Sequence, residues 1–193
     1  GLLNLDDTGT ATTRIGGTGR TMNLANGNFT FIANGTAASA LQFGALTSTW
    51  GGNTITLNNG GAATATLTFA SLVSTSVGGG SVLRFSSSQT FNNSTNKVTF
   101  GTTAPTLTNG LIQRAVITDA SGTNFATFNG VVTTGNLQAF SAYTVSDGSG
   151  VGTDVTFTNV NGGTDIWYAS ASIDLSVPST PADDFVLATP VRL

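Results

Sequence analysis

Short segments of strand-forming residues recur along this chain at nearly regular intervals. Each ends in a large apolar residue, and the intervals between these residues are 12, 14, 12, 16 and 15 positions. The residues concerned are Phe31, Phe43, Leu57, Phe69, Phe85 and Phe100. Turns rich in Gly and Asn separate the segments, and no window carries apolar residues at helical spacing over three turns. The pattern therefore predicts an all-β fold made of many short strands.

The predicted strands alternate between an apolar face and a face of Thr, Ser or Asn. They lie at 28–33, 40–44, 53–58, 65–72, 81–86, 96–101, 111–118, 123–128, 141–146, 154–160 and 165–175. Such spacing is typical of an antiparallel β-sandwich and of a β-solenoid. Only 8% of the residues are charged, which favours the solenoid, because like charges stacked about every 4.8 Å along parallel rungs would repel one another.

The leading prediction is thus a parallel β-helix (β-solenoid) with coils of about 20–30 residues, and the antiparallel β-sandwich is the alternative. Rungs are expected over residues 1–177, followed by a proline-containing tail at 178–193. The apolar residues expected to stack in the core are Phe31, Leu67, Phe69, Leu83, Phe85 and Phe100.

Composition excludes several classes of function. The 193 residues include no His, Cys or Glu, so the usual general base, thiolate nucleophiles and zinc or iron–sulfur ligands are missing. The net charge of −3 and the scattered arginines argue against nucleic acid binding. No run of 18 apolar residues predicts a membrane helix. Because the chain begins at Gly1 without a signal peptide pattern, we expect a mature form or a segment of a longer protein.

Several segments keep their order with respect to a known family. They are "LNLDDTG" (3–9), "TTRIGGTGRTMNLANGNFTFIAN" (12–34), "ATLTFASL" (65–72), "GGGSVLRF" (78–85), "NKVTFGTTAPTLTNGLIQRAVI" (96–117) and "GTNFATFNG" (122–130). Over residues 2–145 the chain resembles the autotransporter-associated β-strand repeat proteins of Planctomycetes and Verrucomicrobia. The resemblance implies an extracellular, right-handed parallel β-helix exported as an autotransporter-type passenger. It implies no catalytic residues.

Two groups of residues are candidates for ligand binding. Trp50, Trp167 and Tyr168 could form a surface on which sugar rings stack, although aromatic residues of this kind also serve in cores and caps. The segment Asp147–Asp154 offers closely spaced oxygen ligands that suit calcium. It lacks the ligand spacing of an EF-hand, and a turn with solvated Asp is the alternative.

Adjacent carboxylates occur as Asp6–Asp7 and Asp183–Asp184. Paired carboxylates are used by enzymes that cleave polysaccharides. Neighbours on a strand point to opposite faces, however, so neither pair is expected to converge by itself. The alternative role is solubilising charge at strand edges.

The C-terminal tail contains three of the four prolines and a short apolar stretch, "FVLA" at 185–188. We expect this tail to cap its own solenoid or to dock on a neighbouring copy, which would give a head-to-tail fibre. The residues of the possible assembly segment are Phe185, Val186, Leu187, Val191 and Leu193.

The leading functional prediction is a non-enzymatic structural protein, a segment of an extracellular cell-surface or matrix fibre that self-associates. The first alternative is an adhesin that binds a glycan or another surface partner. The second is a β-helix enzyme that degrades polysaccharides. No cofactor is expected for the leading function.

Overall fold

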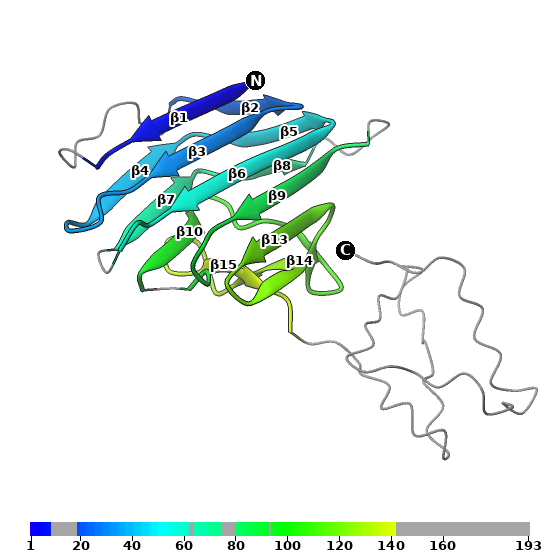
Figure 1. Ribbon diagram of the computed structural model, residues 1–193. Helices are drawn as coiled ribbons and strands as arrows, with labels where there is room; N and C mark the ends of the chain where they lie inside the picture. Colours follow the sequence, from blue (N-terminus) through cyan, green and yellow to red (C-terminus); the bar gives the residue numbers. More distant parts are fainter. Residues whose placement is uncertain (9–18, 62–63, 75–79, 93, 142–193) are drawn as a thin grey trace, which may run out of the picture. The chain divides into compact units, whose positions relative to one another are not determined.

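The computed structural model describes residues 1–8, 19–61, 64–74, 80–92 and 94–141 (Figure 1). The chain divides into two compact units, Gly1–Phe140 and Ser141–Leu193, and the described residues belong to the first unit except for Ser141. They form fifteen strands and no helix, which confirms the all-β prediction for this part of the chain. Accordingly, the described residues hold no helix long and apolar enough to span a bilayer. The strands predicted at 141–146, 154–160 and 165–175 and the boundary at residue 177 lie outside the described residues.

Most strands belong to three sheets. The large sheet has the order β1 (Leu2–Asp6), β3 (Asn28–Ile32), β6 (Gly52–Asn58), β9 (Val82–Ser86), β13 (Ala115–Asp119), β14 (Gly122–Asn129) and β15 (Asn136–Ala139). The second sheet contains β4 (Ser39–Phe43), β7 (Ala65–Phe69) and β10 (Asn96–Phe100). The third sheet contains β2 (Met22–Ala25), β5 (Leu46–Trp50) and β8 (Leu72–Ser74). A small ribbon joins β11 (Leu107–Thr108) and β12 (Leu111–Ile112).

The chain visits the third, the large and the second sheet in turn, and it does so three times, from β2 to β10. Each strand pairs in parallel with the strand of the next passage, so the strands of the large sheet follow one another across it (Figure 1). The offset between paired residues is shortest between Met22 and Leu46, at 24 positions, and longest between Leu83 and Ala115, at 32. These offsets are close to the predicted coil length.

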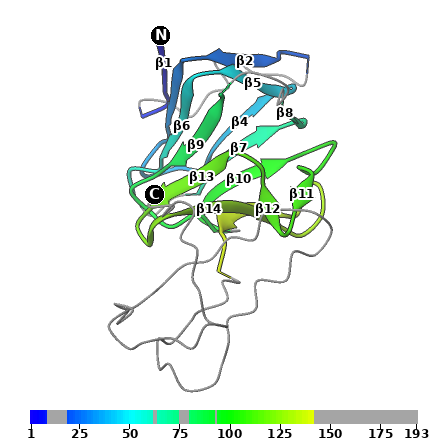
Figure 2. The same cartoon turned by 90° about the vertical axis from the view of Figure 1, so that its right-hand side faces the viewer.

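The two ends of this arrangement differ. Strands β1 and β2 lie at one end, whereas β11, β12 and β14 lie at the other (Figure 2). At the second end β13 pairs with β14, and β14 with β15, in antiparallel fashion. The parallel order therefore gives way to an antiparallel meander after β13.

The core consists of rows of side chains in register. The six residues predicted for it are all buried, with 4% exposure at most. One row follows the large sheet and runs through Leu3, Phe29, Ile55, Phe85 and Ile117. Rows of this kind arise because parallel strands in register place alternate side chains directly above one another.

Phenylalanine rings form a second feature of the core, which we call the ring stack: Phe29, Phe43, Phe69, Phe100 and Phe128. Phe43, Phe69 and Phe100 come from paired positions of the second sheet, with ring centroids 5.9 Å and 6.3 Å apart. Phe29 and Phe128 contact the two ends edge-on, at 5.5 Å and 5.4 Å. The ring stack therefore joins the successive passages through the core.

Two predicted strands are interrupted. The segment 65–72 contains β7 and the start of β8, because the chain turns at Ala70, whose N–H donates to the carbonyl of Phe43 across a corner. The segment 111–118 is split between β12 and β13 by Arg114, which has a φ of 58°. A left-handed residue cannot continue a strand. Neither break has a Gly or Pro to signal it in the sequence.

Candidate functional site

Trp50 lies at the end of β5 and is 57% exposed. Its carbonyl accepts a hydrogen bond from the N–H of Asn26, at 3.0 Å, which fixes the main chain on which the ring is mounted. Its exposure favours the predicted surface role over a core role. Trp167 and Tyr168, the other members of the predicted aromatic surface, lie outside the described residues, so their clustering stays a prediction.

The remaining predicted sites are only partly covered. The possible calcium segment Asp147–Asp154, the pair Asp183–Asp184 and the possible assembly segment lie outside the described residues; the assembly segment comprises Phe185, Val186, Leu187, Val191 and Leu193. Within the described part, no group of three His, Cys, Asp or Glu side chains could hold a metal ion.

Asp6 and Asp7 do not form a joint site. Asp6 is exposed, and its Oδ1 accepts hydrogen bonds from the N–H and the hydroxyl of Thr8, at 2.9 Å and 2.6 Å. Asp7 is buried, and its N–H donates to the carbonyl of Ile32. The two neighbours thus differ in environment, as expected for adjacent residues at the end of a strand.

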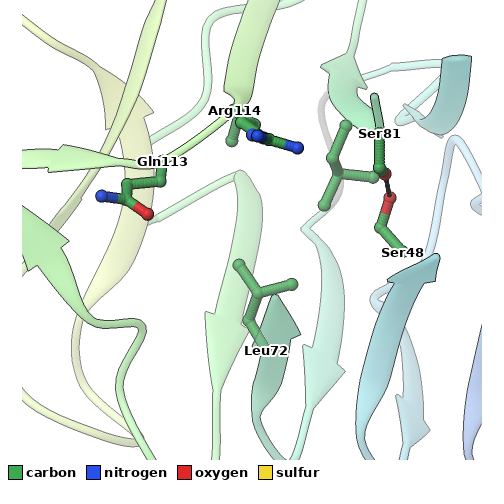
Figure 3. A pocket seen from close by; sticks show the side chains of 7 residues that line it. Ser48, Leu72, Ser81, Gln113 and Arg114 are labelled. Atoms are coloured by element: carbon green, nitrogen blue, oxygen red, sulfur yellow. Dashed lines mark hydrogen bonds between the residues drawn. The ribbon is translucent and has the colours of Figure 1, made fainter. Parts of the chain in front are cut away.

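A small cavity lies where β5 and β8 face the starts of β9 and β13. The hydroxyls of Ser48 and Ser81 hydrogen-bond on one side, and Leu72, Gln113 and Arg114 line the rest (Figure 3). Its volume of about 20 Å³ is enough for a single water molecule. Sites for small organic ligands are typically about 300–1,000 Å³, so this cavity is too small for one.

The outer face of the large sheet carries a row of hydroxyl side chains, here called the hydroxyl row: Thr30, Thr56, Ser86, Thr118 and Thr123. The strands are paired in register, so these side chains recur about every 4.8 Å. The hydroxyls of Thr118 and Thr123 hydrogen-bond at 3.1 Å. The row contains no charged residue, as the alternation of the sequence predicts.

The N-terminal end of the large sheet has an open edge, which we call the β1 edge: the side of Leu2–Asp6 that faces away from β3. No strand among the described residues pairs with it. Leu2 and Leu3 are 67% and 47% exposed. Exposed apolar residues on an unpaired edge are the usual basis for pairing with another strand.

The opposite end is closed. Phe128 and Leu137, from β14 and β15, are buried there. The hydroxyl of Thr99 donates to the carbonyl of Gly135 at 2.6 Å, and the N–H of Thr133 donates to the carbonyl of Phe100 at 2.8 Å. These contacts fasten the antiparallel meander onto β10.

Three asparagines are buried that the sequence analysis had assigned to outer faces: Asn53, Asn59 and Asn96. Asn53 links successive passages, because its Oδ1 accepts from the N–H of Gly27 at 3.0 Å while its Nδ2 donates to the hydroxyl of Ser48 at 2.9 Å. Each of the three lies at or next to a strand end beside a Gly- or Asn-rich turn. That position is the signal that could have identified them.

No protein-family model, no curated protein and no solved structure matches the chain. The resemblance to autotransporter-associated β-strand repeat proteins therefore stays a prediction.

Proposed function

We propose that this chain is a non-enzymatic structural protein, a right-handed parallel β-helix that serves as a segment of an extracellular cell-surface or matrix fibre. The observation that carries the proposal is the parallel pairing in register of successive passages over three sheets. Strands joined in this way stack like the rungs of a solenoid, and each added coil contributes its own stability. An antiparallel sandwich would instead need antiparallel neighbours throughout the sheets.

Handedness follows from a general rule. Parallel strands of one sheet that are joined by a crossover are connected in the right-handed sense in about 98% of cases. The chain returns to the large sheet in this way between β3 and β6 and between β6 and β9. The right-handed form implied by the family resemblance is thus also the form that the rule favours.

The surface chemistry supports a passive role. The hydroxyl row offers many weak hydrogen-bonding groups and no charge, so neighbouring rods could lie side by side without repulsion. Asp6 and Asp7 do not converge on a common site, and the one cavity described above is too small for a substrate. These features favour a scaffold over an enzyme. The extracellular location rests on the family resemblance.

Electron microscopy of the purified protein tests the proposal. We expect filaments that are lost when residues 179–193 are deleted, because the tail is predicted to dock on a neighbouring copy. Isolated short rods under all conditions would contradict the fibre role. Filaments that persist in the truncated chain would contradict only the role of the tail.

An adhesin is the second candidate, and the exposure of Trp50 favours it. An exposed indole ring can stack on a sugar ring. If this is its role, Trp50→Ala should lower binding to a panel of immobilised polysaccharides at least about tenfold, equivalent to about 1.4 kcal/mol. Val131→Ala is the matched control, since Val131 is also an exposed apolar residue. Equal binding by the two variants would reject the adhesin role of Trp50.

A further inference from the structure

We propose that the β1 edge pairs with the β1 edge of a second copy, so that two chains form a two-fold dimer joined through their N-terminal ends. This inference rests on the self-association contained in the proposed function, but it names a different contact from the C-terminal tail. Its partner is a second copy of the same chain, bound by main-chain hydrogen bonds between two β1 strands.

The hydrogen bonds of β1 determine which groups are available. The carbonyl of Gly1 accepts from the N–H of Asn28, and the N–H of Asp7 donates to the carbonyl of Ile32, both at 2.8 Å. In a parallel pair only alternate residues of a strand bond to a given neighbour. Because the odd-numbered residues of β1 bond to β3, the main-chain groups of the even-numbered residues, Leu2 and Asn4 among them, point toward the open edge.

The core row of the large sheet supplies the apolar part of the contact. Its members Phe29, Ile55, Phe85 and Ile117 are buried to 1% exposure or less, whereas Leu3, in the same row, is 47% exposed. The side of Leu3 that lacks a neighbouring strand is therefore the open one. A further strand on this edge would bury Leu3 as the other members of the row are buried.

Two β1 strands complement each other when a two-fold axis passes through Asn4. The two copies of Asn4 then exchange both main-chain hydrogen bonds, the pattern of a hydrogen-bonded pair in an antiparallel ladder. Leu3 lies opposite Leu5 of the second copy, on the core face, and Leu2 lies opposite Asp6 on the outer face. No like charges face each other, and β1 has no Pro, Lys or bulge of the kind that protects natural edge strands.

The closed end explains why the partner is the same edge of another copy. The antiparallel meander covers the core at the far end and buries Phe128 and Leu137. The described unit therefore has one open end of the large sheet, not two. A single self-complementary edge gives an isologous contact, which closes on itself as a dimer.

Light scattering coupled to size exclusion of the full 193-residue chain tests the inference. The expected mass is twice the 19.4 kDa of one chain. Asn4→Pro removes an N–H that points to the open edge, and a proline is tolerated there because the bonds to β3 stay intact. We expect this variant to dissociate to the monomer.

Substitutions of Leu2 test the register. Leu2→Asp would place a carboxylate opposite Asp6 of the second copy and should raise the dissociation constant at least tenfold, whereas Leu2→Lys should keep the dimer. Val131→Asp is the matched control, because Val131 is 66% exposed but lies at the far end, and it should also stay dimeric. If circular dichroism shows that Asn4→Pro does not fold, the contrast between the two Leu2 variants decides.

A wild-type mass of 19.4 kDa at concentrations up to about 100 µM, far above a micromolar dissociation constant, would overturn the inference. So would dimers that persist in both Asn4→Pro and Leu2→Asp. The fibre proposal fails separately. Filaments built from subunits without a β1 contact would leave the fibre and remove the dimer, whereas dimers that never form filaments would do the reverse.

Discussion

Replacing Phe69 by leucine removes the middle ring of the ring stack and leaves a buried apolar side chain in its place. Phe69 is fully buried on β7, and its ring lies 5.9 Å from that of Phe43 and 6.3 Å from that of Phe100. Aromatic pairs at such distances contribute about 0.5–1.5 kcal/mol each beyond their buried area. The loss of two pairs should therefore lower the free energy of unfolding by about 1–3 kcal/mol, in addition to the effect of the smaller side chain.

Phe91→Leu provides the reference for that additional effect. Phe91 is also buried, but no ring pair is recorded for it among the described residues. The same substitution there should cost less than about 1.5 kcal/mol, as expected for a swap between apolar side chains of comparable volume. The difference between the two variants isolates the contribution of the ring contacts.

Urea unfolding followed by far-ultraviolet circular dichroism measures both variants. The comparison holds when the slope m is the same as in the wild type, since a changed m indicates that the transition has lost its cooperativity. We expect a lower midpoint for Phe69→Leu than for Phe91→Leu. Equal midpoints would show that contacts between rings do not add to the burial of apolar area, and the reasoning about the ring stack would be wrong.

Two further predictions concern polar burial and close packing. Asn53→Ala leaves main-chain and hydroxyl groups without their partner and should cost about 1–3 kcal/mol, whereas Thr54→Ala on the outer face should change stability by at most about 0.5 kcal/mol; equal melting temperatures would contradict the buried hydrogen-bonding role of Asn53. In Gly135→Ala the new Cβ would lie 2.7 Å from the ring of Phe128, which should cost about 1–3 kcal/mol and speed hydrogen exchange in β14 and β15. Gly52→Ala, with nothing within 4 Å, should leave exchange there unchanged, and a similar effect of both substitutions would refute the predicted clash.

The all-β class, the coil length and the predicted core follow from local patterns in the sequence. Alternation in segments such as Asn53–Asn58 places Ile55 and Leu57 on one face and Thr54 and Thr56 on the other, whatever the neighbouring strands are. The near absence of charge adds a restriction that acts between strands, because stacked like charges would repel. These signals are properties of single strands or of composition, so one sequence suffices to read them.

The missed features depend on which strands become neighbours. Strand β5 begins with Leu46 but places Ser48 at its next inward position, which weakens its apolar pattern, yet Ser48 is buried because Asn53 donates to its hydroxyl. The antiparallel direction of β14 is equally hidden, because its Ala126 and Phe128 alternate with outward residues just as in a parallel strand. Direction and the partners of buried polar groups are set by tertiary contacts, and a single-strand pattern does not contain them.

The candidate sites divide in the same way. The exposure of Trp50 was one of two readings that the sequence left open, because a tryptophan next to a turn suits both a surface and a cap. The β1 edge was not predicted at all. Its recognition requires knowing that Leu3 belongs to a row of otherwise buried side chains, which only the register of β1, β3 and β6 establishes.

The two ends of the described unit restrict how a fibre could be built from it. A two-fold contact between β1 edges closes on itself, so it yields dimers and no further growth. Growth in one dimension then requires a second, independent interface on each dimer. The closed end at β14 and β15 does not offer an unpaired edge of the parallel kind, and the segment Phe185–Leu193 is the predicted source of the second contact. Deleting residues 179–193 should thus stop filament growth at the dimer, whereas Asn4→Pro should stop it before the dimer forms, and the mass of the arrested species separates the two contacts.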